Sequence, residues 1–257
     1  MLKRERLERI LQMVNTKGIV KAQEIMNSLD VSDMTVRRDL DELEKSGKLV
    51  RVHGGAQSIH YSIDVELTHT EKSTVHIDEK TEIAKLAAQK VHDHDSIFLG
   101  PGTTIELMAS MIESKPARII TNSLPVFEIL KNKFSDALLL TGGSYRSNTG
   151  CFIGVITNNV LENMNFNSAF FSCNGLADTK ISTSTLEEGE AQRIALNNSH
   201  YRYLLADGSK FNREDFCTYY HLYNIDTLIT DSNVSAHVIE RYAVHTKIEQ
   251  AGKETLK

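Results

Sequence analysis

The chain has 257 residues, a net charge of −5 and a hydrophobic content of 40%. No apolar run approaches the length of a membrane span, and the charged N-terminus lacks the apolar core of a signal peptide, so we expect a soluble cytoplasmic protein. Residues 1–60 carry eleven Lys or Arg and nine Asp or Glu, a net of +2, which leaves −7 for the remainder. Only the N-terminal part therefore suits a polyanion, and the acidic remainder limits nonspecific binding to DNA.

Three short helices are predicted first. Apolar residues at the helical spacing i, i+3, i+4 and i+7 mark two of them. They are Leu7, Ile10, Leu11 and Val14 in the first helix and Ala22, Ile25, Met26 and Leu29 in the second. Ser32 is a favourable N-cap for a third helix from about Asp33 to Ser46, which ends where Gly47 can adopt the left-handed conformation.

The third helix has the layout of a DNA-recognition helix. Val36, Leu40 and Leu43 share its apolar face, and cationic side chains lie away from that face. Arginine in the first turns of such a helix pairs with guanine in the major groove, and Thr or Met contacts a thymine methyl. The residues predicted to contact DNA from this helix are Ser32, Met34, Thr35, Arg37 and Arg38. A solvated basic surface is the alternative, but the helices, the cap and the basic segment that follows together favour DNA binding.

A basic hairpin follows the third helix. Residues 48–55 alternate in character and end in two glycines, which is typical of strands joined by a tight turn. We expect Lys48, Arg51 and His53 of this wing to contact phosphates, which fix register without reading sequence. Residues 1–58 are thus predicted to form a winged helix-turn-helix domain. The polar stretch 59–72 is interpreted as a linker, and residues 73–257 as a second domain.

The larger domain alternates helices with short apolar strands. Strands are expected near residues 96–100, 118–121, 137–141, 169–173, 203–207 and 227–231, with a first long helix from about Ile77 to Val91. This alternation predicts an α/β fold whose mainly parallel sheet is covered on both faces. Ligands of such sheets bind beyond the carboxyl ends of the strands.

The sequence predicts neither a metal site nor a cofactor. Residues 92–95 alternate His and Asp, but neighbouring side chains on a turn diverge, so a solvated turn is favoured over a metal site. Cys151, Cys173 and Cys217 have no zinc-like spacing and are expected to be buried free thiols.

Polar or glycine residues follow five of the predicted strands. After the first strand, two glycines, free helix amides and two hydroxyls suit a phosphate, although a tight turn with a Thr cap explains that segment equally well. Asn and Asp at other strand ends can bond sugar hydroxyls, and Lys210 either supplies positive charge or is a surface lysine. The predicted ligand-binding residues are Gly100, Gly102, Thr103, Thr104, Asn122, Gly142, Gly143, Asn174, Asp207 and Lys210.

These motifs resemble a known family. Residues 32–40 and 51–56 look like the N-terminal signature of the DeoR family of bacterial sugar-operon regulators. The glycine, threonine and asparagine motifs at the strand ends, with Ala206-Asp207-x-Ser-Lys210, are similar to the effector domain of that family. The resemblance implies an effector domain related in fold to the pentose phosphate isomerases.

Within that family, four segments look like the lactose phosphotransferase-system repressors of Gram-positive bacteria: residues 100–106, 122–126, 170–174 and 182–187. This resemblance implies a repressor that leaves its operator DNA when tagatose 6-phosphate binds. Gly175-Leu-Ala departs from the Gly-Ile-Asp of many family members, which leaves the exact sugar open. One winged helix offers a small interface for DNA, so we also expect a homo-oligomer, either a dimer or a tetramer.

Three other functions fit parts of the sequence. A DeoR-type regulator of another sugar-phosphate pathway shares every motif described above. A sugar-phosphate isomerase needs a carboxylate base, which Glu187, Glu188 or Glu190 offers, but a solvated acidic first turn of a helix explains these residues better. A DNA-architectural protein without a ligand leaves the polar strand ends unexplained. The sequence therefore favours a repressor that is not an enzyme.

Overall fold

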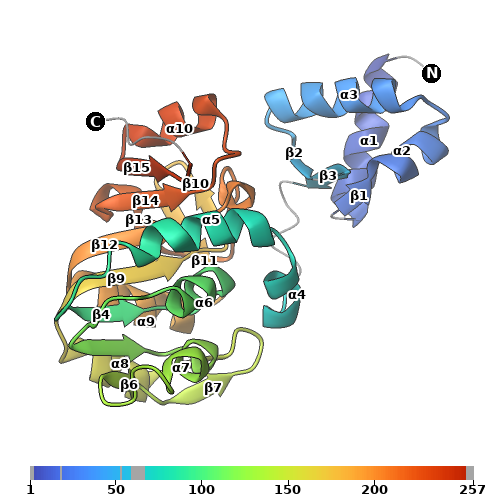
Figure 1. Cartoon of the computed structure of the whole chain (residues 1–257). Coiled ribbons are helices and arrows are strands. Elements are labelled where there is room, and N and C mark those ends of the chain that lie inside the picture. Colours follow the sequence, from blue (N-terminus) through green and yellow to red (C-terminus); the bar gives the residue numbers. More distant parts are fainter. Residues whose placement is uncertain (1–2, 18, 53, 59–66, 253–257) are drawn as a thin grey trace. The chain divides into compact units, whose positions relative to one another are not determined.

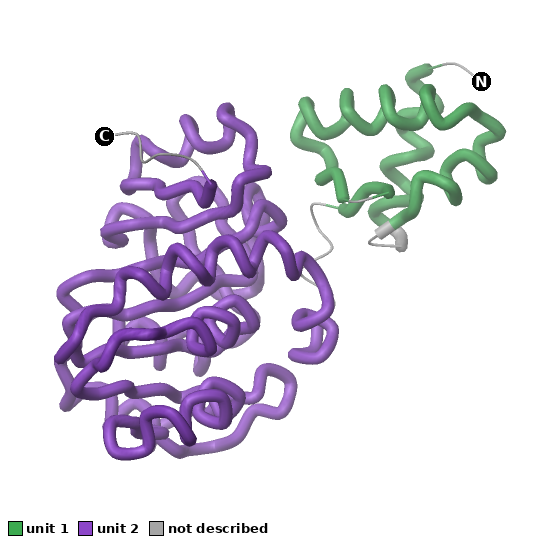
Figure 2. Tube along the Cα trace, viewed as in Figure 1, with its two compact units in different colours: residues 1–66 green, residues 67–257 purple. Residues whose placement is uncertain are grey.

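The computed structural model describes residues 3–17, 19–52, 54–58 and 67–252. The chain divides into two units, Met1–Glu66 and Leu67–Lys257, which are coloured separately in Figure 2. Among the described residues, no helix has both the length and the apolar character that crossing a membrane requires.

The N-terminal unit combines three helices with a three-stranded sheet (Figure 1). Its elements are α1 (Lys3–Lys17), β1 (Ile19–Lys21), α2 (Ala22–Leu29), α3 (Asp33–Lys45), β2 (Leu49–Val52) and β3 (Gly55–Ser58). The predicted hairpin is confirmed, because β2 and β3 pair antiparallel, and β1 adds to the other side of β3. The sequence did not predict β1, since three residues are too few to show an alternation.

Both ends of α3 follow from local sequence. The Ser32 side chain accepts a hydrogen bond from the backbone N–H of Thr35, which caps the helix start as predicted. At the other end Gly47 has φ +67°, its N–H bonds the carbonyl of Glu44, and the N–H of Lys48 bonds the carbonyl of Leu43. This pair of bonds is a Schellman motif, in which glycine is favoured because the conformation is left-handed.

A buried ion pair holds α3 against α1. Arg6 donates from Nε and Nη2 to the two carboxylate oxygens of Asp39, the second bond at 3.1 Å. The Asp39 side chain is fully buried, and that of Arg6 is 12% exposed. The predicted apolar faces of the three helices are buried around this pair; the residues are Ile10, Val14, Ile25, Val36, Leu40 and Leu43.

The larger unit is built on a seven-stranded sheet with the order β15-β14-β12-β9-β4-β5-β6. Every pairing within it is parallel, as predicted. The strands are β4 (Ser96–Leu99), β5 (Arg118–Thr121), β6 (Leu138–Leu140), β9 (Phe166–Ser172), β12 (Ser199–Leu205), β14 (Thr227–Thr230) and β15 (Lys247–Gln250).

Helices cover both faces of this sheet (Figure 1). One face packs against α5 (Ile77–Ala88), α6 (Thr103–Ser110) and α7 (Leu124–Leu130), and the other against α8 (Val155–Glu162), α9 (Leu186–Asn197) and α10 (Ala236–Ala243). Successive residues of β4 alternate between the two cores: Ile97 and Leu99 join the first, and Phe98 joins the second. The two-faced burial explains why the central strands are apolar throughout.

Several short elements were not predicted. A second sheet with the order β10-β11-β13 is antiparallel throughout, and β7 pairs with β8 as a separate hairpin. These elements are β7 (Ser144–Arg146), β8 (Cys151–Ile153), β10 (Gly175–Ala177), β11 (Lys180–Thr183), β13 (Cys217–His221) and two 3₁₀ turns, Gly208–Lys210 and Leu222–Asn224.

The prediction of buried free thiols is confirmed for all three cysteines.

The predicted linker, residues 59–72, extends too far at its C-terminal end. Residue 58 is the last residue of β3, but residues 69–74 form the helix α4 (His69–Thr74). The side chain of Thr68 caps the N–H of Glu71, and the Glu71 side chain returns a bond to the N–H of Thr68. No residue of α4 is buried, so the helix has no apolar period, but the Thr-x-x-Glu capping box is a signal that the sequence contained.

We predict that Asp39→Ala lowers the free energy of unfolding of the N-terminal unit by about 3–5 kcal/mol, because it leaves the Arg6 guanidinium buried without its carboxylate. Urea unfolding followed by circular dichroism measures this loss. The control is Arg4→Ala, which breaks an exposed pair with Glu8 and should cost about 0.5 kcal/mol or less. Equal losses in the two variants would contradict a structural role for the buried pair.

Candidate functional site

The exposed face of α3 carries the residues predicted to read DNA. Met34 is 82% exposed, and both arginines are exposed. Arg37 pairs with Asp33 one turn earlier at 2.8 Å, whereas Arg38 has no ion-pair partner among the described residues. The hydroxyls of Ser32 and Thr35 bond each other at 2.9 Å across the helix start. The face therefore presents one paired and one unpaired guanidinium beside an apolar thioether.

The wing is fixed to α3 by Arg51. Its guanidinium donates to the Asp41 carboxylate at 2.6 Å and to the carbonyl of Arg37 at 3.2 Å, and its backbone N–H bonds Glu44. This arrangement orients β2 against the recognition helix, so a contact between Arg51 and a phosphate has to compete with Asp41. Lys48 is exposed, and His53 lies outside the described residues. The predicted phosphate contacts of these three side chains stay predictions.

The five polar strand ends lie at one edge of the parallel sheet. The sheet order places β12, β9, β4, β5 and β6 side by side, and all five run in the same direction. The segments that follow them contain every predicted ligand residue. The order of the strands in space, which the sequence did not predict, is what brings them together.

The turn after β4 leads directly into α6. Gly102 has φ +134° and is the N-cap of α6 without any side-chain cap, so the first amides of the helix are not bonded by a capping side chain. A Cβ at this position would lie 3.4 Å from the Ser172 side chain. Thr103 and Thr104 are buried behind the turn. The N–H of Gly100 instead bonds the carbonyl of Phe170 at 2.9 Å, which continues the pairing of β4 with β9.

The turns after β5 and β6 differ in character. Asn122 is buried and donates to the carbonyl of Phe152 at 3.0 Å, while its Oδ1 has no hydrogen-bond partner among the described residues. Gly142 and Gly143 both have positive φ, +69° and +122°. A Cβ on Gly143 would lie 2.4 Å from the Thr157 hydroxyl, which itself bonds the carbonyl of Gly142. Close packing on α8 thus accounts for the second glycine, and ligand contact by this pair stays a prediction.

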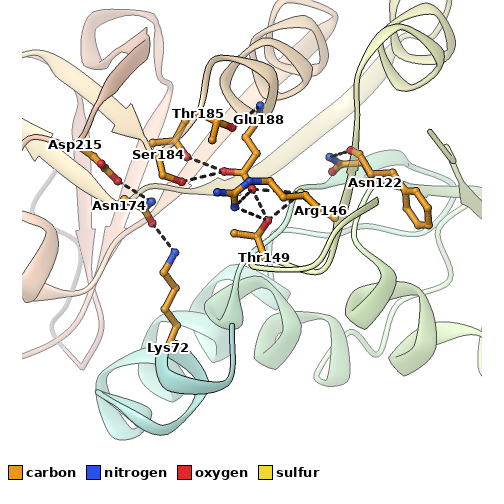
Figure 3. Close-up of polar contacts among 12 residues, drawn as sticks. Lys72, Asn122, Arg146, Thr149, Asn174, Ser184, Thr185, Glu188 and Asp215 are labelled. Carbon is orange, nitrogen blue, oxygen red and sulfur yellow. Dashed lines mark hydrogen bonds and ion pairs between the residues drawn. The ribbon is translucent and has the colours of Figure 1, made fainter. Parts of the chain in front are cut away.

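Asn174, which follows β9, forms hydrogen bonds through both the oxygen and the nitrogen of its side-chain amide. Its Oδ1 accepts a hydrogen bond from Lys72 Nζ at 3.2 Å, and its Nδ2 donates to Asp215 at 2.8 Å (Figure 3). Lys72 belongs to α4, so the helix that replaces part of the predicted linker reaches the strand ends.

Asp207, after β12, is buried with one oxygen bonded and one not. Its Oδ1 accepts bonds from the N–H and hydroxyl of Ser209, and its Oδ2 has no hydrogen-bond partner within the described part of the chain. Burial alone would raise the pKa of this carboxyl, but the charge of Lys210 and the bonds from Ser209 outweigh it and hold the pKa below its usual value. Asp207 is therefore ionised at neutral pH and has an open acceptor.

Glu188 differs from its prediction as part of a solvated helix turn. It is buried at the start of α9, and Arg146 of the β7–β8 hairpin donates to it at 3.2 Å (Figure 3). Its other donors are the side chains of Thr149, Cys151, Thr183 and Ser184. Burial and the neighbouring Glu188 charge raise the pKa of the Cys151 thiol to about 12. These bonds join the hairpin, β11 and α9, and they saturate the carboxylate.

A cavity of about 480 Å³ lies beside α4. Its lining residues are Thr68, His69, Thr70, Pro125, Tyr145, Ser147, Asn148 and Gly150. None of the residues predicted from sequence lines it. His69 bonds Glu106 of α6 at 2.8 Å, which connects this cavity to the helix that begins at the β4 turn.

Two family comparisons match the two units. A sequence model of the DeoR-like helix-turn-helix domain matches residues 6–62, and one of the DeoR C terminal sensor domain matches residues 75–232. The chain belongs to the DeoR family. The family resemblance predicted from the motifs is thereby confirmed.

Several curated relatives of this DeoR-family chain are named lactose phosphotransferase system repressors. The protein from Streptococcus mutans serotype c is 48% identical over 90% of this chain and 93% of its own length. That from Lactococcus lactis subsp. lactis is 43% identical over 98% and 100%. Among solved structures, ribose 5 phosphate isomerase A from Neisseria gonorrhoeae has a TM-score of 0.39 and 15% identity over 51% of this chain and 52% of its own.

We predict that Gly143→Ala lowers the free energy of unfolding of the larger unit by about 3 kcal/mol, because it adds a steric clash to a strained backbone. The matched control is Gly142→Ala, where φ is also positive but no atom lies within 4 Å of the new Cβ, so we expect a loss of about 1 kcal/mol. Urea unfolding curves of the two variants give the comparison. A smaller loss for Gly143→Ala than for Gly142→Ala would show that the close approach to α8 does not exist.

Proposed function

We propose that this protein is a cytoplasmic repressor of a sugar catabolic operon, that lactose or galactose is the sugar consumed, and that tagatose 6-phosphate releases it from operator DNA. The observation that carries the ligand half is a pair of buried acceptor oxygens at the strand ends, Asn122 Oδ1 and Asp207 Oδ2, which have no hydrogen-bond partner among the described residues. Buried polar atoms are ordinarily bonded, so two open acceptors at one sheet edge suit the hydroxyl donors of a sugar.

The proposed binding to DNA rests on α3 and on the hairpin of β2 and β3 that follows it. Arg38 and Met34 project from the exposed face, and a recognition helix needs this arrangement to reach base edges in the major groove. A single winged helix buries a small area on DNA, so we infer a homo-oligomer that contacts two half-sites and gains affinity through effective concentration. The names of the lactose repressor relatives support both the repressor role and the sugar.

The proposed ligand binding assigns a role to four of the five strand ends. The phosphate would lie on the uncapped amides and hydroxyls of residues 102–104, near Lys210, because helix starts and lysine both favour a dianion. The sugar hydroxyls would bond Asn122, Asn174 and Asp207. Binding at Asn174 would compete with Lys72, which occupies the Oδ1 of that side chain in the structure described here.

Release from DNA requires that the ligand favour the state that does not bind operator. A tenfold preference shifts the equilibrium by about 1.4 kcal/mol, so an effective switch needs roughly two such steps. The isomerase alternative has less support, because Glu188, the buried one of its three candidate bases, is saturated by internal donors, and Glu187 is exposed on the first turn of α9. No observation favours a DNA-architectural role, which leaves the open acceptors without purpose.

We predict that Arg38→Ala weakens operator binding by about 1–3 kcal/mol and relaxes sequence preference, because bidentate pairing with guanine is lost. Lys48→Ala should weaken operator and scrambled duplex alike and reduce the slope of log affinity against log salt by about one, because it removes a phosphate contact. Fluorescence anisotropy over a salt series separates the two effects. Operator affinity in Arg38→Ala and Arg37→Ala equal to that of the wild type would refute α3 as the recognition helix.

We also predict that tagatose 6-phosphate lowers operator affinity, and that it binds about 100-fold more tightly than free tagatose, because charge-assisted hydrogen bonds to a dianion contribute about 1.5–3 kcal/mol each. Calorimetry with both sugars, alongside other hexose phosphates, measures the difference. Asn122→Ala should weaken binding by roughly tenfold, because it removes one hydroxyl acceptor. Equal affinity for tagatose and its phosphate would remove the phosphate role of the β4 turn.

A further inference from the structure

Lys80 is a buried lysine of the helix α5, and no motif in the sequence predicted a role for it. It lies in the first turns of α5, on the same face as Ile83, Ala84 and Ala87, which form part of the core. It is 4% exposed. Its ammonium donates to the backbone carbonyl of Lys72 in α4, the one hydrogen bond that it makes to the described residues.

The charges around Lys80 come from three other elements. Asp207 and Lys210 follow β12, Glu106 lies in the first turn of α6, and Lys72 lies in α4. Glu106 already bonds His69. Three ammonium groups thus lie in this region. Of the two carboxylates there, Asp207 has one oxygen that lacks a partner among the described residues. A lysine ammonium has three donors, and burying it with one acceptor is costly, so the Lys80 ammonium has two donors left for an anion.

We propose that Lys80 and Lys72, together with Lys210, bind the phosphate of the ligand at the start of α6. The inference deepens the proposed function, because it assigns the anion-binding groups of the same site. A phosphate dianion offers several acceptor oxygens to these three ammonium groups. It also explains why a lysine occupies a position on the apolar face of α5, where an aliphatic side chain would otherwise pack.

Proton uptake on ligand binding would distinguish phosphate contact by Lys80 from contact by the other two lysines. Burial first, and then the positive charges of Lys210 and Lys72, lower the pKa of Lys80 to about 8 against the opposing charges of Asp207 and Glu106. A bound dianion favours the ammonium form and raises that pKa. At pH 8.5 a phosphate monoester is already fully ionised, since its second pKa is about 6. A proton taken up from the buffer on binding at pH 8.5 would therefore bind to the protein, and Lys80 is the group that accepts it.

The test is calorimetry of the full-length protein at pH 8.5 with tagatose 6-phosphate and with inorganic phosphate, in two buffers of different ionisation enthalpy. Wild type should take up a fraction of a proton per ligand. Lys80→Met should lose this uptake and bind roughly 10- to 100-fold more weakly, because a charged hydrogen-bond donor is lost. The matched control is Lys85→Met, which removes an exposed lysine from the same helix and should change neither quantity.

Lys80→Arg guards against a folding defect in the methionine variant. Arginine keeps the charge but stays protonated at pH 8.5, so this variant should retain more affinity than Lys80→Met and show no proton uptake. Lys72→Met should weaken both ligands and keep most of the uptake, because Lys72 is the smallest of the charges that shift the pKa of Lys80. Wild-type affinity in Lys80→Met, or undiminished uptake in Lys80→Arg, overturns the proposal.

Operator release is measured separately, so that the two proposals fail in different ways. If phosphate binding depends on Lys80 but leaves operator affinity unchanged, the proposed function alone is contradicted. Binding of neither tagatose 6-phosphate nor inorganic phosphate to the wild type would overturn both.

Discussion

Parallel pairing of β6, β5, β4, β9 and β12 places five turns of the chain at one edge of a sheet. Helices bury both faces of these strands, so the strands themselves are apolar and polar chemistry is confined to the turns. Asn122 and Asp207 are buried there by their neighbours, with one oxygen of each lacking a partner among the described residues. The parallel sheet thus gathers the polar groups at one edge and buries these two acceptor oxygens.

The elements that the sequence predicted are those whose signals are local. The cap at Ser32, the left-handed Gly47 and the apolar strands of the parallel sheet all follow from near neighbours, and the structure has them. The three-residue strand β1 depends on a distant partner, β3, for its hydrogen bonds, and nothing in its own sequence marks it. The spatial order of strands, which creates the site, is likewise a property of packing.

Two features that were not predicted do carry a signal in the sequence. Lys80 stands at i−3 and i−4 from apolar positions of a predicted helix, and a charged residue on an apolar face needs a reason. Thr68 and Glu71 form a capping box inside the polar stretch that was interpreted as a linker. Glu188 had no such signal, because its burial depends on Arg146 and Thr149 of a hairpin nearly forty residues away.

The helix α4 links ligand chemistry to the chain that leads to the DNA-binding unit. It buries no side chain, and polar contacts hold it: Lys72 to Asn174, His69 to Glu106, and Lys80 to the carbonyl of Lys72. Such bonds contribute about 1 kcal/mol each, so a ligand that replaces several of them can change the position of α4.

The most direct test of this account compares the affinity of tagatose 6-phosphate for the free protein with its affinity for the operator-bound protein. The account predicts at least roughly tenfold weaker binding to the operator complex, since coupling is reciprocal, and equal affinities would contradict it.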